Sequence, residues 1–341
     1  MKNDASNVTQ PFRLGVAGYV HTATVSLVLL LACWIVVSNA LIMAAPRVHH
    51  SLRRRAFLLV TSLAAADLLT ALFMPAAWIM AVIDAFMPPD PRRDVTTSRS
   101  FCMVVQFFFI CPMLASVLNL LLIAVDRYVA VVHPMRYRLL LPRRRIYTLI
   151  ALAWCVSFAV ACVHFVWHRT PKDGKYQCSG RDMKPMYIYI CIVLPFIIIA
   201  STMTVLYLRI FLSIRRSERS GIRTAQSQST RRRSDVSAAK MLGITMGVFL
   251  FCWSPLLVTL LLFVADKVGI TTLLLPHILA YANSGMNFFI YAARSKEYQR
   301  AFSKICRCCC CCRKNNAGQT SSGPVVQQLQ TSTSRSGAME N

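Results

Sequence analysis

The stretch FCMVVQFFFICPMLASVLNLLLIAVDRY, residues 101–128, decides the fold of this chain. It is a long apolar run that ends in the charged pair Asp126 and Arg127, followed by Tyr128. Charge at the edge of a bilayer costs free energy unless the charged group has a partner or a function. We therefore expect a membrane-spanning helix whose charged pair lies where the helix meets the cytoplasm.

Six further apolar runs have a similar length, and a spanning helix needs about 20 mostly apolar residues. The chain has 341 residues, of which 56% are hydrophobic and 15% charged, a composition that soluble domains rarely show. The sequence thus predicts an all-α membrane protein, a seven-transmembrane helix bundle with a short amphipathic eighth helix. The spans are predicted at roughly 19–45, 56–83, 101–132, 146–167, 186–213, 237–265 and 271–293.

The net charge of +25 is concentrated in every second loop and in the C-terminal tail. This positive-inside distribution places the N-terminus outside and the C-terminus inside, and it argues against nucleic-acid binding. We expect a multi-pass plasma-membrane protein that is glycosylated at Asn7, in the exterior sequon Asn7-Val8-Thr9. The basic residues of the three loops include Arg47, Arg53, Arg54, Arg55, Arg136, Arg138, Arg143, Arg144, Arg145, Arg215, Arg216, Arg219, Arg223, Arg231, Arg232 and Arg233.

The segments outside the spans fall into three regions. Residues 1–18 are predicted to form an extracellular tail before the bundle of residues 19–293, and residues 313–341 a disordered cytoplasmic tail. Residues 294–312 are predicted to form an amphipathic helix on the inner leaflet and a cysteine cluster. The apolar face of that helix carries Tyr298, Ala301, Phe302 and Ile305.

Cysteines at two places suggest modification. Cys102 and Cys178 fall at exterior positions, where the oxidising compartment favours a disulfide between them, and two free thiols are the alternative. The cytosolic cluster of Cys306 and Cys308 to Cys312 suits palmitoylation, above all at Cys306, Cys308 and Cys309. Metal binding is the alternative there, but an unbroken run has poor spacing for tetrahedral ligation.

Asp67 is the most informative polar residue within the spans. It sits mid-span with no basic residue in its own segment, so it must protonate, bind a cation or pair across helices. A carboxylate among neutral oxygen donors is a reasonable site for a hard monovalent cation. Candidate neighbours at a comparable depth are Asn39, Ser116, Asn119, Asn283, Ser284 and Asn287.

Prolines occur within five spans, and each interior proline removes a backbone hydrogen bond and permits a kink. Kinked helices can act as pivots, whereas prolines can also be simply tolerated in membrane helices. We interpret Pro112 in the second way. The other four are Pro75, Pro195, Pro255 and Pro276.

Together these residues closely resemble the rhodopsin-like (class A) G-protein-coupled receptors, over about residues 20–305. The resemblance rests on an ordered set of motifs. They are Asn39, Leu63-Ala64-Ala65-Ala66-Asp67, Cys102 with Cys178, the run from Asp126-Arg127-Tyr128 to Tyr137, Trp154, Pro195, Phe249-Leu250-Phe251-Cys252-Trp253-Ser254-Pro255 and Asn287-Phe288-Phe289-Ile290-Tyr291.

The resemblance implies a receptor, not an enzyme, in which an extracellular ligand favours an open cytoplasmic state. Arg127 would pair with Asp126 and Asp235 in the closed state, and outward movement of the sixth span near Pro255 would admit a heterotrimeric G protein. Tyr128 and Tyr291 belong to the same coupling region. Arrestin, a receptor kinase and membrane lipid are the further partners implied. No cofactor is expected beyond an allosteric sodium ion, held by Asp67, Ser116, Asn283 and Asn287.

The chain departs from the family pattern at three positions. Phe288 replaces the seventh-span proline, Met203 replaces the fifth-span tyrosine, and His164 lies near the place of the absent fourth-span proline. Tyr207 lies one turn after Met203. The usual active-state partner of Tyr291 is therefore missing from its position.

The resemblance limits the choice of ligand mainly by exclusion. Tyr281 stands where an opsin needs lysine, and Phe109 where an aminergic receptor needs aspartate. The motifs of the seventh span favour a neuropeptide, whereas the leucine-rich sixth span suggests a lipid. The expected pocket residues are Trp78, Gln106, Phe109, Met113, Trp253, Leu256, Leu257, Leu260, His277 and Tyr281.

A membrane transporter or a membrane enzyme is the alternative from another class. The spans show no inverted repeat and no paired broken helices, which argues against a transporter. No metal motif or nucleophile–base pair is evident within the bilayer, which argues against an enzyme.

Overall fold

A computed structural model describes residues 5–52, 55–86, 99–167, 184–219 and 226–318. This part of the chain is helical and contains no strand. The long helices are α1 (Ala5–Val48), α2 (Arg55–Phe86), α3 (Arg99–Val132), α5 (Arg143–Val166), α7 (Leu194–Arg219), α8 (Gln226–Val264), α9 (Leu274–Arg294) and α10 (Lys296–Gly318). The short elements are η1 (His50–Leu52), α4 (Tyr137–Leu140), α6 (Pro185–Tyr187), η2 (Ile188–Val193) and η3 (Ile270–Leu273).

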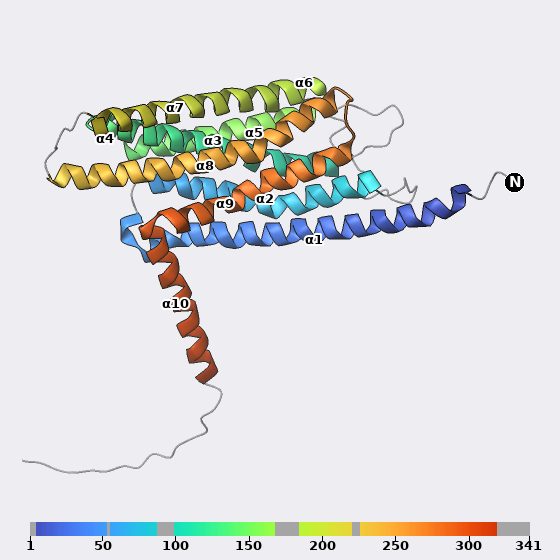
Figure 1. Ribbon diagram of the computed structural model, residues 1–341, viewed down its shortest axis with the longest axis horizontal. Helices are drawn as coiled ribbons and strands as arrows, with labels where there is room; N and C mark the ends of the chain where they lie inside the picture. The colour runs from blue at the N-terminus through green and yellow to red at the C-terminus, as the bar shows by residue number, and fades with distance from the viewer. Residues whose placement is uncertain (1–4, 53–54, 87–98, 168–183, 220–225, 319–341) are drawn as a thin grey trace, which may run out of the picture.

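The long helices α1, α2, α3, α5, α7, α8 and α9 lie side by side and form the predicted bundle (Figure 1). In the described chain, six helices are long and apolar enough to cross a membrane, and α9 falls short of that standard. The shortfall has a physical cause, because α9 carries Asn283, Ser284 and Asn287, all of them buried. A spanning helix tolerates polar residues that face the protein interior rather than lipid.

Several helices extend beyond the predicted spans. The first helix begins at Ala5, so most of the predicted tail is helical, and α8 begins at Gln226 rather than near residue 237. Hydropathy marks the thickness of the bilayer, whereas a helix ends only where its backbone hydrogen bonds end. In the same way α10 continues to Gly318, so residues 313–318 are helical rather than disordered. Residues 319–341 lie outside the described chain.

Proline has different effects at different positions. Pro75, Pro112 and Pro255 lie inside α2, α3 and α8, which continue through them. Pro195 is the second residue of α7 and lies two residues after the end of the π-helical segment η2, where the wider turn changes the hydrogen-bonding pattern of the backbone. Such π segments are frequent at functional sites, and η2 contributes to the cavity described below.

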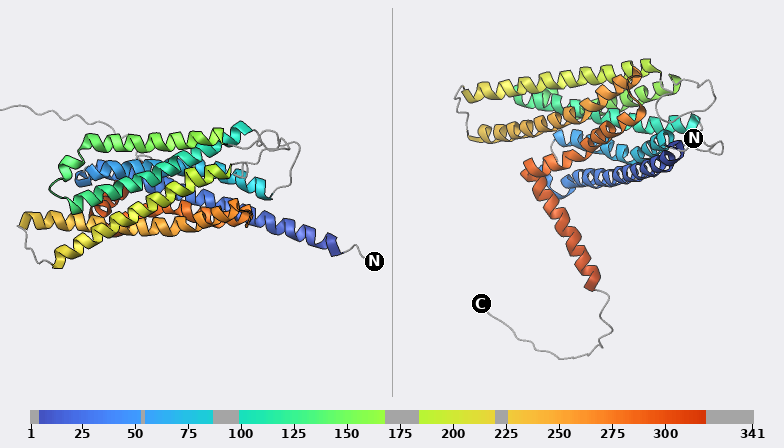
Figure 2. Two further views of the ribbon diagram at one scale, coloured as in Figure 1. Left: turned by 90° about the horizontal axis from the view of Figure 1, so that it is seen from above. Right: turned by 45° about the vertical axis from the view of Figure 1, so that its right-hand side comes forward.

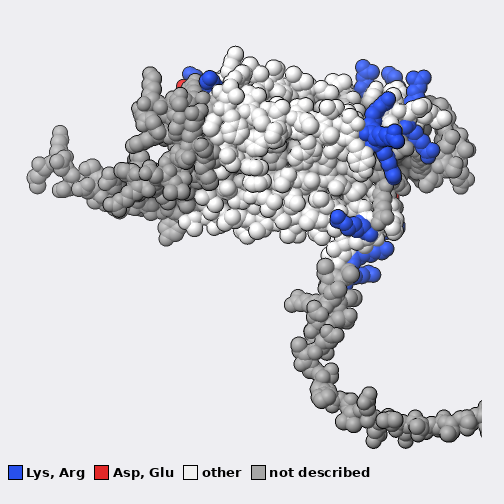
Figure 3. All heavy atoms as spheres, turned by 180° about the vertical axis from the view of Figure 1, so that it is seen from behind, with Lys and Arg blue, Asp and Glu red and all other residues white. Residues whose placement is uncertain are grey.

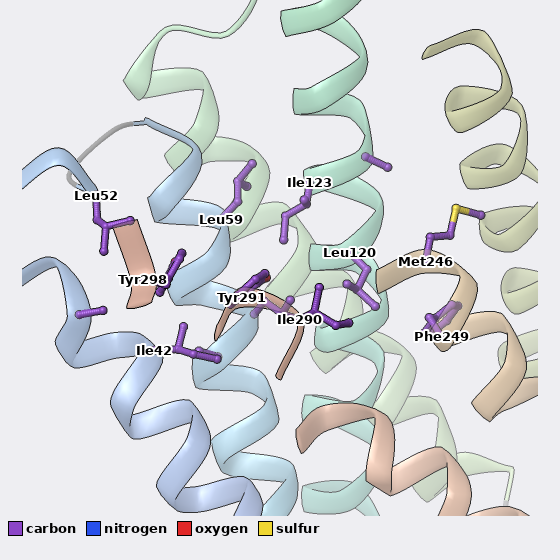
Figure 4. Packing of buried hydrophobic residues seen from close by; sticks show 14 of the residues in the cluster. Ile42, Leu52, Leu59, Leu120, Ile123, Met246, Phe249, Ile290, Tyr291 and Tyr298 are labelled. Carbon is purple, nitrogen blue, oxygen red and sulfur yellow. The ribbon is translucent and has the colours of Figure 1, made fainter. Parts of the chain in front are cut away.

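The bundle is held by one large apolar cluster with residues from most of the long helices (Figure 4). It includes Ile42, Leu59, Leu120, Ile123, Met203, Met246, Phe249, Ile290, Tyr291, Tyr298, Ala301 and Phe302. Trp154 of α5 adds a polar link to this region, since its Nε1 donates to Ser62 Oγ of α2 at 3.1 Å.

Helix α10 leaves the bundle at a steep angle (Figures 1 and 2). Its predicted apolar face packs against the bundle near its start, because Tyr298, Ala301 and Phe302 are all buried. Burial raises the pKa of the Tyr298 hydroxyl well above its usual value, so this side chain stays uncharged. The first turns of α10 are therefore part of the folded core.

Charge is distributed unevenly along the bundle. On the face shown in Figure 3, Lys and Arg gather mainly at the end from which α10 leaves, and the middle is almost free of charge. The exposed basic residues at this end include Arg136, Arg138, Arg143, Arg144, Arg145, Arg215, Arg216 and Arg300. An uncharged belt between polar ends is what a membrane protein requires.

An aromatic cluster joins α1 to α9 at an unusually close approach. Trp34 stacks on Phe289 with ring centroids 4.9 Å apart and meets Phe288 edge-on at 5.6 Å. Phe288 also contacts Phe302 of α10, at 4.7 Å. Gly285 makes this possible, because a Cβ atom there would lie 2.7 Å from the Trp34 ring.

We predict that Gly285→Ala destabilises the protein by about 1–3 kcal/mol, because the added methyl group overpacks the α1–α9 contact. The measurement is thermal unfolding of the purified protein in detergent. Gly247→Ala in α8 is the matched control, since an added Cβ atom there would meet nothing within 4 Å. That control should be neutral or stabilising by up to about 1 kcal/mol.

The cause is tested by combining Gly285→Ala with Trp34→Ala. If the Trp34 ring is the obstacle, the two costs are less than additive. Equal unfolding midpoints for Gly285→Ala and the wild type would contradict the proposed contact.

Candidate functional site

The first candidate site surrounds Asp67 of α2, which is completely buried. Ser116 Oγ of α3 donates to its Oδ1 at 2.8 Å, and Ser284 Oγ of α9 donates to the same oxygen at 2.9 Å. Asn287 Nδ2 of α9 donates to Oδ2 at 3.1 Å. The hydrogen-bond donors to Asp67 thus come from α3 and α9 rather than from its own helix.

The predicted set around Asp67 is largely brought together, with one exchange. Ser284 rather than its neighbour Asn283 hydrogen-bonds the carboxylate among the described contacts. Asn39 of α1 joins the network through the backbone of Ser284, because its Nδ2 donates to the carbonyl oxygen of Ser284 at 3.0 Å. The network therefore connects α1, α2, α3 and α9 at one depth.

The chemistry of this group suits a small hard cation. The carboxylate and the two serine hydroxyls are oxygen ligands, which such cations prefer. One turn along α3 from Ser116, the Oδ1 atom of Asn119 is buried and unpartnered among the described residues. A single carboxylate among neutral oxygen and amide groups suits a monovalent rather than a divalent ion.

The second candidate site lies at the charged end of the bundle, where α3 ends. Asp126 and Arg127 are buried and form an ion pair, in which Arg127 Nε donates to Asp126 Oδ2 at 2.9 Å. Tyr137 of α4 donates its hydroxyl to the other carboxylate oxygen at 2.8 Å. Tyr128 packs instead against Ile210 and Ile214 of α7.

Tyr207 lies close to this pair, and Tyr291 lies close to Tyr207. Tyr207 is within electrostatic reach of both Arg127 and Tyr291. Tyr291 is 1% exposed, and its hydroxyl has no hydrogen-bond partner among the described residues. Met203, at the position expected to carry tyrosine, is buried in the apolar cluster. Tyr207 therefore supplies a hydroxyl group near Tyr291, which Met203 cannot do.

The third candidate site is a cavity of about 200 Å³ between α2, α3, η2, α7, α8 and α9. All of the expected pocket residues line it: Trp78, Gln106, Phe109, Met113, Trp253, Leu256, Leu257, Leu260, His277 and Tyr281. Sequence reasoning missed the wall formed by η2 and α7, which presents Ile188, Ile192 and Phe196. The segment around Pro195 is apolar on all sides, so its sequence does not indicate which side chains face the cavity.

Other predicted residues lie outside the described side chains. They are Asn7, Cys102, Cys178, Asp235, Cys308 and Cys309. The disulfide, the glycan and the pairing of Asp235 with Arg127 therefore remain predictions. Cys306 is a free, exposed thiol on α10.

Sequence reasoning also missed the role of Tyr137, which begins the short helix α4 between α3 and α5. Its spacing from Asp126 carries no helical signal, because the chain turns between α3 and α4. The contact of Ser284 had a clearer signal, since adjacent polar residues in a spanning helix both require partners.

Comparison with known proteins gives a consistent result. Residues 38–291 match the family model described as 7 transmembrane receptor (rhodopsin family). The adenosine receptor A2a of Homo sapiens is 30% identical over 312 residues, which cover 82% of this chain and 71% of that receptor. The allatostatin-A receptor of Bombyx mori is 27% identical, covering 80% and 76%. The melanocortin receptor 5 of Mus musculus is 26% identical, covering 79% and 80%.

Proposed function

The chain belongs to the rhodopsin family of seven-transmembrane receptors, and we propose that it converts binding of an extracellular ligand in the cavity into activation of a heterotrimeric G protein. It is a multi-pass membrane receptor and not an enzyme. The observation that carries the proposal is the joint presence of a mostly apolar cavity and a buried Asp126–Arg127 pair near the opposite, basic end. Family membership also argues against the transporter alternative.

We place the receptor in the plasma membrane with its N-terminus outside and its basic end in the cytoplasm. The gathering of Lys and Arg at the end of the bundle from which α10 leaves supports this orientation (Figure 3). The exposed Cys306 on α10 supports palmitoylation of that helix next to the inner leaflet. Arrestin and a receptor kinase are the further cytoplasmic partners proposed.

Coupling would begin with release of Arg127. In the closed state its guanidinium is neutralised by Asp126, whose second oxygen is held by Tyr137. Outward displacement of α8 about Pro255 would open the space beside α3, so that Arg127 could meet the G protein. Tyr207, with Tyr291 beside it, is the phenol that would support Arg127 once it turns from Asp126.

We also propose a sodium ion at Asp67. The ion would be held by the carboxylate, the hydroxyls of Ser116 and Ser284 and the side chain of Asn287. The side chains that donate hydrogen bonds to Asp67 would instead turn their oxygen atoms toward the ion. The ion would then bridge α2, α3 and α9. Such bridging would favour the closed bundle, because displacement of these helices would break the ligand set.

Two ligand classes are supported, a peptide and a small molecule. A peptide is supported by similarity to the allatostatin-A and melanocortin receptors and by the motifs of the seventh span. Similarity to the adenosine receptor A2a supports a small molecule instead. The mostly apolar lining of the cavity favours a lipid-like ligand.

We predict that Arg127→Ala abolishes coupling while leaving the receptor at the cell surface. Nucleotide exchange, measured as agonist-independent GTPγS binding in membranes, should fall by about tenfold or more, a change of at least about 1.4 kcal/mol. Arg47→Ala is the matched control, because Arg47 is exposed at the same end and contacts only its own helix in the described bonds. Undiminished exchange in Arg127→Ala would refute the coupling role.

We predict that sodium stabilises the wild-type receptor and that Asp67→Asn removes the effect, because the amide lacks the charge that a cation requires. At sodium concentrations of ten times Kd the stabilisation is about 1.4 kcal/mol. The measurement is thermal unfolding in sodium chloride against choline chloride at equal ionic strength. Ser284→Ala should weaken the sodium response more than Asn283→Ala, and a full response in Asp67→Asn would reject the site.

A further inference from the structure

The cavity carries no formal charge on its described walls. None of the described residues that line it is Asp, Glu, Lys or Arg. A charged ligand group buried there would meet no counter-ion, and an unpaired buried charge costs several kcal/mol. The lining therefore selects a neutral ligand at this depth.

Trp78 and His277 are polar side chains in one corner of the cavity, between α2 and α9. Gln106, Trp253 and Tyr281 are the further polar side chains among the described residues that line it. Trp78 is 6% exposed, and its Nε1 donor is buried without an acceptor among the described residues. His277 lies beside it, with ring centroids 6.4 Å apart. The opposite wall, formed by η2, α7 and α8, is mostly apolar and presents Ile192, Phe196 and Leu257. It also carries the indole of Trp253, whose Nε1 is buried without an acceptor among the described residues.

The hydrogen bond of His277 determines which donors and acceptors this corner of the cavity presents to a ligand. Its Nδ1 lies 2.7 Å from the carbonyl oxygen of Leu273, which can only accept, so Nδ1 carries the proton. Apolar surroundings disfavour a charged ring, so Nε2 remains as an acceptor. The corner thus combines one N–H donor with one nitrogen acceptor.

A hydroxyl is the simplest neutral group that satisfies both, because it accepts one hydrogen bond and donates another. A carbonyl or ether would satisfy Trp78 only, and an apolar group would leave both unpaired. Size adds a further limit. An apolar cavity of about 150 Å³ binds benzene, so about 200 Å³ admits a body somewhat larger than one ring or a medium-length chain.

We propose that this cavity binds a neutral, lipid-like alcohol, with its hydroxyl between Trp78 and His277 and its hydrocarbon body against η2, α7 and α8. The proposal names the ligand class of the receptor function proposed above and rests on it. The body contacts Trp253, which itself packs on Phe196 and Phe249 with centroids 5.9 and 5.8 Å away. A bound ligand would therefore contact the aromatic side chains through which α8 packs against the bundle.

The test uses the full-length receptor in lipid nanodiscs and a medium-chain alcohol that bears a photoreactive diazirine and an alkyne tag. Matched probes carry a methyl ether, a carboxylic acid or a primary amine in place of the hydroxyl. The alcohol should label saturably, with adducts on α7 and α8. The ether, which cannot donate to His277, should bind about three- to tenfold more weakly, and the acid and amine more weakly still.

Two variants separate the hydrogen bonds. Trp78→Phe should weaken the alcohol and the ether alike, about three- to tenfold, because both accept from Nε1. His277→Phe should weaken the alcohol to the same extent and leave the ether within about twofold. Trp34→Phe, outside the cavity on α1, is the matched control and should change neither. Leu257→Trp, which fills the cavity, should abolish labelling by every probe.

The proposal is overturned if the acid or amine labels more tightly than the alcohol, or if labelling is unsaturable. It is equally overturned if His277→Phe weakens the ether as much as the alcohol, or if a peptide library yields a ligand that the alcohol cannot displace. Thermal unfolding of each variant separates loss of binding from loss of folding. If a variant misfolds, the comparison of the four probes on the wild-type receptor still decides the question. Nucleotide exchange is measured separately, so saturable binding without exchange would reject the G-protein function and leave the ligand class standing.

Discussion

The buried carboxylate of Asp67 is the constraint on which the arrangement of the helices depends. A polar group in an apolar interior costs several kcal/mol unless it is hydrogen-bonded, and here the donors come from other helices. Ser116 fixes α3 against α2, while Ser284 and Asn287 fix α9. Because each bond requires a particular depth and rotation, this network specifies the register of the bundle, which apolar packing alone leaves adjustable.

The polar network has a consequence for α9. This helix supplies two of the donors to Asp67 and is less apolar than the other spanning helices, so it depends on contacts with its neighbours. Those contacts are unusually specific, because Gly285 admits the Trp34 ring and Phe288 bridges α1 and α10. At the position where the family carries a proline, this chain thus uses aromatic packing between three helices.

Packed rings connect the cavity with the basic end. Trp253 and Phe196 line the cavity, and both contact Phe249, which belongs to the same apolar cluster as Tyr291 (Figure 4). Packed cores tend to switch between discrete arrangements rather than deform gradually. A ligand that moves Trp253 therefore acts on a core that reaches the neighbourhood of Arg127.

The sequence alone determined the class of fold, the approximate spans, most of the residues that line the cavity and most partners of Asp67. It could do so because the bilayer imposes strong local rules: apolar length, loop charge and the high cost of buried polar groups. Tertiary structure alone decided that Ser284 rather than Asn283 meets Asp67, that Tyr137 returns to Asp126, and that η2 forms a cavity wall. These depend on helix rotation, on a turn between helices and on a local π segment, and none of the three leaves a periodic pattern in the chain.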